Sequence, residues 1–131
     1  MDDPRIHQAQ TLHWQIETLR GLGAHSATLR PRHREIARIY EERAREILAS
    51  TDGLGWTDLF AAVTHWAEAG EAERAQSLLH LGDRLTTAPG EANAAIRSHL
   101  DELRSWLREH RVIPSLAAYA RALPPTPKAA L

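Results

Sequence analysis

Apolar residues recur every three or four positions along almost the whole chain, which is the spacing of an α-helix with one buried face. No window alternates strictly between apolar and polar residues, as a half-buried strand would. Glycine and proline residues interrupt the pattern and mark the helix ends. The sequence predicts an all-α bundle of five to six helices. They are expected to begin near residues 4, 29, 56, 71, 91 and 114, with residues 23–28 as a loop.

The length of 131 residues and the 43% hydrophobic content are typical of one globular domain. We expect a single helical domain over residues 1–123, followed by a flexible Pro-rich tail over residues 124–131. The absence of cysteine excludes disulfides, thiolate metal sites and cysteine nucleophiles. No apolar run is long enough to span a bilayer, and the N-terminus is acidic, so the prediction is a cytoplasmic protein that does not enter a membrane.

The second half of the chain carries a pattern of small and aromatic residues around a short turn. Gly70 is followed by Ala75, Leu79 and Gly82, and Trp66 precedes it. This pattern resembles the second half of a tetratricopeptide-type repeat, and a second copy follows about forty residues later, with Trp106 in place of Trp66. Over residues 56–123 the resemblance implies antiparallel helical hairpins that offer a surface to other proteins.

The charge is nearly balanced overall, at −1, but arginines gather between Leu29 and Arg34. Arg30, Arg32 and Arg34 make this arginine segment (residues 29–34) a candidate contact for an anion, for RNA or for an acidic partner. The alternative is a solvated turn whose arginines pair with Glu35 or with the acidic residues of segment 51–90. DNA binding is not expected, because the helix that would read the bases begins with Glu71 and Glu73.

Eight histidines suggest a metal site, but no two are spaced three or four positions apart, as two ligands on one helix would be. His13, His25 and Glu17 remain a candidate set for a small metal- or ligand-binding enzyme. For His65, His99 and His110, which flank apolar stripes, we expect partly buried, hydrogen-bonded side chains instead. The sequence contains no Gly-x-Ser-x-Gly and no complete nucleotide-binding glycine motif. We therefore predict no catalytic residue, no metal and no cofactor.

Trp14 lies on the side of the first expected helix opposite its main apolar stripe, together with Leu22. Two interpretations are open: Trp14 and Leu22 form a second, exposed apolar face that binds a partner, or the helix is enclosed on both sides. The leading functional prediction is a small bacterial adaptor or regulatory domain without enzymatic activity. It is expected to bind another protein or a second copy of itself through Trp14, Leu22, Arg30, Arg32 and Arg34.

Overall fold

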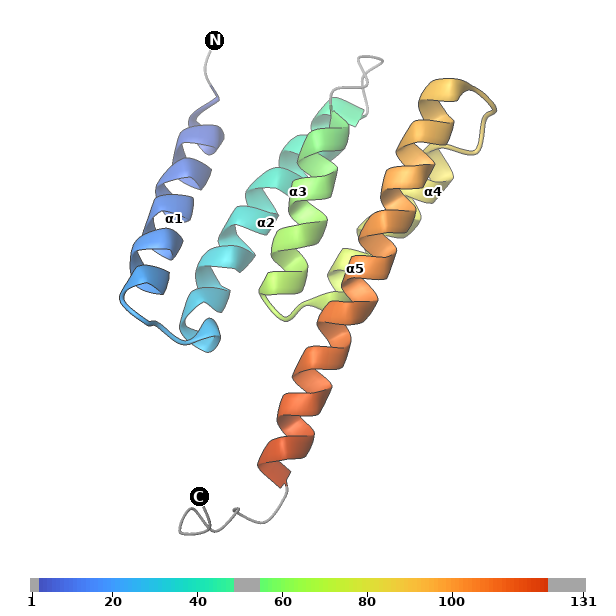
Figure 1. The fold of residues 1–131 in the computed structure, drawn as a ribbon. Helices are drawn as coiled ribbons and strands as arrows, with labels where there is room; N and C mark the ends of the chain where they lie inside the picture. The colour runs from blue at the N-terminus through green and yellow to red at the C-terminus, as the bar shows by residue number, and fades with distance from the viewer. Residues whose placement is uncertain (1–2, 49–54, 123–131) are drawn as a thin grey trace, which may run out of the picture.

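A computed structural model describes the backbone of residues 3–48 and 55–122, and the side chains of residues 3–48 and 55–109. Over these residues the chain forms five helices and no strand, which confirms the predicted all-α class. Successive helices run in opposite directions, and α1, α2 and α3 lie side by side while α4 lies behind α5 (Figure 1). The helices are α1 (Pro4–Gly21), α2 (Ser26–Leu48), α3 (Gly55–Glu68), α4 (Ala72–Leu85) and α5 (Glu91–Ala122).

The first helix begins and ends where its sequence predicts. Asp3 is the N-cap, and its carboxylate accepts a hydrogen bond of 2.9 Å from the backbone N–H of Arg5. Pro4 occupies the first turn, where its missing N–H costs nothing. At the other end, the N–H of Leu22 reaches back to the carbonyl groups of Thr18 and Leu19.

The turn between α3 and α4 is built around Gly70. Its φ of +80° is a conformation that other residues adopt at a cost. The N–H of Gly70 donates to the carbonyl of Ala67, and the N–H of Glu71 donates to that of Trp66. This pair of bonds is the Schellman arrangement that ends a helix and reverses the chain. The predicted antiparallel hairpin of these two helices is therefore present (Figure 1).

Two predicted boundaries were wrong. The expected loop over residues 23–28 is shorter, because α2 begins at Ser26 and Pro31 lies inside the helix. Leu29, only 4% exposed, packs against Ile16 and Ile36. Its burial favours a helical first turn although Pro31 lacks an N–H.

The expected break at Pro114 is also absent, since α5 is one helix from Glu91 to Ala122. The second helical hairpin that the tetratricopeptide resemblance implies around Trp106 is therefore not formed. A proline removes one intrahelical hydrogen bond and does not have to end a helix. The predicted flexible tail over residues 124–131 lies outside the described residues.

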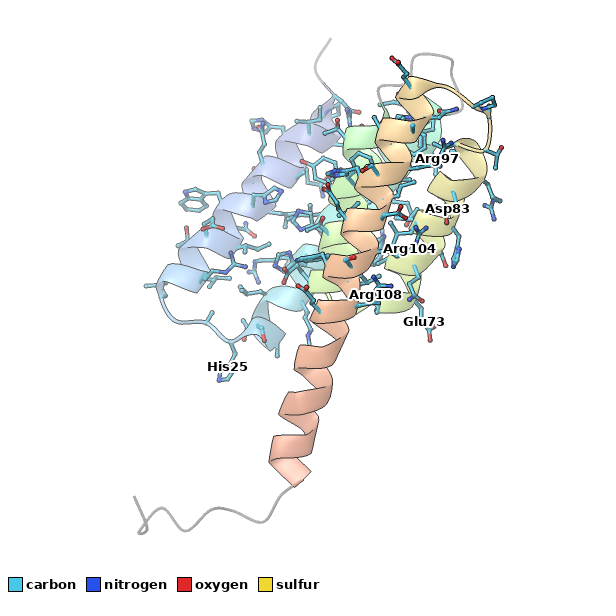
Figure 2. All side chains as sticks on the ribbon, turned by 45° about the vertical axis from the view of Figure 1, so that its right-hand side comes forward. His25, Glu73, Asp83, Arg97, Arg104 and Arg108 are labelled. Atoms are coloured by element: carbon cyan, nitrogen blue, oxygen red, sulfur yellow. The ribbon has the colours of Figure 1, made fainter. Side chains whose placement is uncertain are left out.

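The main core lies between α2, α3, α4 and α5, and a smaller apolar cluster joins α1 to α2. Trp66 is the largest buried side chain of the main core, and its indole N–H donates to Glu41 over 2.8 Å. At the seam of α4 and α5, the Arg104 guanidinium binds Asp83, and Arg97 donates to the carbonyl of Thr86 (Figure 2). Within the described residues, none of the helices has the length and apolar content that crossing a membrane requires.

Candidate functional site

The outer face of α1 carries two of the three large hydrophobic side chains that are exposed among the described residues. Three large hydrophobic side chains are exposed among them: Trp14 at 68%, Leu22 at 80% and Leu85 at 44%. Trp14 and Leu22 belong to the outer face, which we define as Thr11, Trp14, Thr18 and Leu22; Ala9 and Ile16 on the opposite side are buried. The interpretation in which α1 is enclosed on both sides is therefore wrong.

The two threonine hydroxyls of the outer face are already satisfied within the helix. The hydroxyl of Thr11 donates to the carbonyl of His7 over 3.1 Å, and that of Thr18 donates to the carbonyl of Trp14 over 2.9 Å. A partner that covered these threonines would leave no hydroxyl proton without an acceptor. The two threonines can thus be buried at a low desolvation cost.

The arginine segment is largely engaged within the chain. Arg32 donates to the side-chain oxygen of Gln15 over 3.1 Å and so ties α2 to α1. Arg34 lies 3.6 Å from a carboxylate oxygen of Glu71, in the acidic segment that the sequence suggested as its counterpart. The Arg30 side chain passes Gly70, with its Nε 3.5 Å from where a Cβ would stand. Among the described residues Arg30 has no ion pair, so it is the member of this segment whose charge is most available.

Three histidines that are distant in the sequence meet where α1, α2 and α3 come together. His33 and His65 are joined by a hydrogen bond of 2.9 Å between their Nδ1 atoms. The ring of His13 stands edge-on to His65, with 4.7 Å between ring centroids, and Tyr40 stacks beside His65 at 6.2 Å. We call His13, His33 and His65 the histidine cluster.

The geometry of the His33–His65 contact shows that one proton links the two rings. The ring centroids are 5.2 Å apart, which is about the Nδ1–Nδ1 distance plus two ring radii, and the planes differ by 28°. The two nitrogens therefore point directly at each other. In such a contact one imidazole donates and the other accepts, so at least one Nδ1 carries no proton.

Burial makes the histidine cluster resist protonation. It lowers the pKa of His65 to about 3, and the neighbouring His13 and His33 rings add to the shift. Burial likewise lowers the pKa of His33, where the nearby Glu68 carboxylate acts in the opposite direction and Arg20 in the same one. Both side chains are therefore neutral at pH 7.

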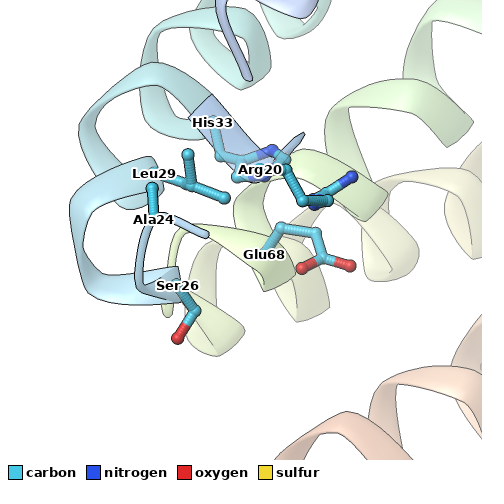
Figure 3. A pocket seen from close by; sticks show the side chains of 6 residues that line it. All are labelled: Arg20, Ala24, Ser26, Leu29, His33 and Glu68. Atoms are coloured by element: carbon cyan, nitrogen blue, oxygen red, sulfur yellow. The ribbon is translucent and has the colours of Figure 1, made fainter. Parts of the chain in front are cut away.

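A pocket of about 150 Å³ opens beside His33, where α1, α2 and α3 end or begin (Figure 3). Its polar lining residues are Arg20, Ser26, His33 and Glu68. His33 and Ser26 lie at opposite ends of this pocket in Figure 3, so His33 is not placed to activate the Ser26 hydroxyl.

The residues of the predicted metal alternative are not gathered into a site. His13 belongs to the histidine cluster, whereas the Glu17 carboxylate pairs with Arg20 at 3.1 Å and is 71% exposed. His25 projects from the α1–α2 connection (Figure 2). Among the side chains that the structure describes, no group of three His, Cys, Asp or Glu residues is arranged to hold a metal ion.

Sequence reasoning identified the exposed face but missed the histidine cluster. The expectation of a partly buried, hydrogen-bonded side chain is confirmed for His65 and wrong for His99, which is exposed, and the side chain of His110 lies outside the described residues. The partner of His65, His33, was assigned only to the arginine segment. His13, His33 and His65 lie on three different helices, so no spacing along the chain connects them. The one available signal was a histidine next to the buried positions of each helix.

Comparison with known proteins adds no relative. The sequence matches no protein-family model, and neither the curated proteins nor the solved structures contain a match to it.

Proposed function

We propose that this chain is a small helical protein-interaction domain, without enzymatic activity of its own, that binds its partner through the outer face of α1. The observation that carries the proposal is the exposure of Trp14 and Leu22 on a helix whose other side is packed. Tryptophan is among the residues that most often anchor protein interfaces. The partner is another protein or a second copy of this chain.

The position of α1 supports this role. It is the edge helix of the bundle, with α2 beside it (Figure 1), and Trp14 and Leu22 of its outer face are exposed. Arg30 lies at the same end of the bundle as Leu22, close to the α1–α2 connection, and would pair with an acidic group of the partner. Arg32 and Arg34 contribute indirectly, because their bonds to Gln15 and Glu71 fix α2 against its neighbours.

The hairpin of α3 and α4 is in keeping with an interaction domain. Ala75 is fully buried and Gly82 lies against Leu100, so small residues stand at close helix contacts, as in tetratricopeptide-like layouts. A cytoplasmic location in a bacterium is part of the proposal. It is supported by a cysteine-free, arginine- and alanine-rich composition.

The proposal is tested by capture of partners from native lysate on the immobilised chain, with and without nuclease. We expect a stoichiometric, nuclease-resistant protein that is lost with Trp14→Ala and with Leu22→Ser. Leu85→Ser is the matched control, since Leu85 is an exposed leucine on α4 and should leave binding unchanged. Sedimentation of the purified chain shows whether the partner is a second copy.

Equal capture by the Trp14→Ala variant, or a captured species that disappears with nuclease, would contradict the proposal. The second outcome would instead favour RNA binding through Arg30, which should then weaken steeply as salt is raised.

A further inference from the structure

The histidine cluster joins α1 to α3. Apart from this cluster, α1 is held by the apolar contacts of Leu12, Ile16 and Leu19 with α2, by the Arg32–Gln15 bond and by an ionic network at its N-terminus. The edge-on contact of His13 with His65 lies midway along α1, one residue before Trp14 of the outer face. Whatever changes the charge of these rings therefore acts on the helix that carries the outer face.

The cluster accommodates protons poorly. Protonating both His33 and His65 would set two N–H groups against each other across 2.9 Å and remove the hydrogen bond. A proton on His65 would also place its charge 4.7 Å, ring to ring, from His13. Like charges at that distance in a partly buried site repel each other strongly.

The surrounding charges do not offset this repulsion. On α1, His13 and Arg20 act on the His33 ring. On α2, Tyr40 lies beside His13, and Arg43 acts on Tyr40. From α3, Glu68 faces His33, while Asp58 acts on Tyr40 and is bound by Arg43 at 3.5 Å. Among the described residues, Glu68 is the carboxylate that acts on His33, and the cation of Arg20 acts against it.

We propose that the histidine cluster is an acid-sensitive latch: at neutral pH its rings hold the middle and C-terminal half of α1 against α2 and α3, and their protonation below about pH 6 releases this half of the helix. The consequence for binding rests on the proposed function. Release of α1 removes the rigid support of Trp14 and Leu22, so partner binding weakens at acidic pH.

The N-terminal end of α1 stays attached over the same pH range. Arg5 binds Glu46 at 2.7 Å and Asp3 at 2.9 Å, and Arg43 binds Asp3 at 2.7 Å. The side-chain hydrogen bonds from Arg5 lower the pKa of both Asp3 and Glu46 below their ordinary values. Both carboxylates therefore remain charged while the histidines titrate, and the release is confined to the part of α1 beyond this network.

The test is amide hydrogen exchange of the full chain at pH 7.5 and pH 5.0, corrected for the intrinsic pH dependence of exchange. It needs no partner, so its outcome is independent of the proposed function. We expect the protection of amides in residues 12–21 to be lower by about tenfold or more at pH 5.0. A single histidine that binds a proton only when α1 is released favours the released state by about this factor. Residues 59–66 of α3 and 75–82 of α4 should keep their protection.

Two variants separate the latch from general acid sensitivity. In His33→Asn combined with His65→Asn, the amides replace the Nδ1 groups with non-titrating ones, and the pH dependence of residues 12–21 should largely disappear. The matched control is His25→Asn, because His25 is exposed in the α1–α2 connection and should leave the pH dependence unchanged.

The proposal is wrong if residues 12–21 of the wild-type chain exchange equally at both pH values. It is also wrong if the double variant shows the same loss of protection at pH 5.0 as the wild-type chain. A second measurement applies even where the double variant does not fold. Imidazole nitrogen NMR of the wild-type chain should show that His33 and His65 bind protons only at a pH below the ordinary histidine pKa of about 6.5. Titration of both rings at that ordinary value would overturn the proposal.

Discussion

Gly82 of α4 lies so close to Leu100 of α5 that a Cβ atom at position 82 would stand 2.9 Å from Leu100 Cδ2. Leu100 is fully buried in the main core, so it has little room to move. The approach of these two helices therefore depends on the absence of a side chain at Gly82.

Gly82→Ala should destabilise the fold by about 1–3 kcal/mol, the usual effect of overpacking a core. Gly21→Ala is the matched control, since Gly21 is in a helix with no neighbouring side chain within 4 Å of an added methyl group. That change should stabilise the fold by about 0.4–1 kcal/mol. Urea unfolding of both variants measures the difference, and equal effects would show that α4 and α5 adjust freely.

Replacement by alanine should affect the free energy of unfolding strongly at Trp66 and hardly at all at Trp14. Trp66 is 1% exposed, donates to Glu41 and lies beneath the Arg74 guanidinium at 4.6 Å. Its replacement by alanine should cost about 3–5 kcal/mol through the cavity it leaves. Trp14→Ala should change the free energy of unfolding by no more than about 0.5 kcal/mol. A large loss of stability with Trp14→Ala would show that this side chain is structural.

Arg43 should be the most sensitive charged residue of α2. It is 15% exposed and binds both Asp3 and the largely buried Asp58. Arg43→Met would leave the Asp58 carboxylate without its cation, at a cost of about 3–5 kcal/mol. Arg45→Met is the control, because its pair with Glu41 is exposed and contributes about 0.3–0.5 kcal/mol. Chemical denaturation at pH 7 compares the two, and similar losses would contradict the importance of the buried pair.

The stability of the fold should decrease as the pH falls below about 6.5. His33 and His65 have pKa values lowered in the folded state, chiefly by burial, His65 to about 3. Above the ordinary histidine pKa neither state binds these protons, so stability is full. Below it only the unfolded chain binds them. The free energy of unfolding then decreases by up to about 1.4 kcal/mol per pH unit for each histidine, until the pH reaches the pKa of that histidine in the folded state.

Urea unfolding at half-unit steps from pH 7.5 to 4.5 measures this slope. Asp3 and Glu46, whose pKa values are lowered, make their contribution above the ordinary carboxyl range and lose it only at more acidic pH. The slope between pH 6.5 and 5 therefore reports the histidines. A stability that stays constant over that interval would show that they are not buried as described.

Several helix boundaries could be predicted from the sequence because they have a local cause. Asp3 caps α1, and Gly70 provides the positive φ that reverses the chain before α4. The start of α2 and the continuity of α5 were not predictable in this way. At Ser26 the helix depends on the burial of Leu29 against Ile16, a contact between helices.

The candidate sites also differ in whether they depend on local sequence or on the packing of helices. Periodicity placed Trp14 and Leu22 opposite the buried stripe of α1, and whether they are exposed depended on how many neighbours α1 has in the bundle. Periodicity could not relate His13, His33 and His65, because their meeting depends on the relative rotation and register of three packed helices.

The sequence by itself determined the helical class, the turn at Gly70 and the two-sided character of α1, because helix formation, capping and amphipathicity depend on residues a few positions apart. Only the tertiary structure decided that the outer face stays open, that Arg32 and Arg34 bind within the chain, and that three histidines share one partly buried junction. Those outcomes depend on long-range packing, in which burial sets both the exposure of a side chain and the cost of charging it.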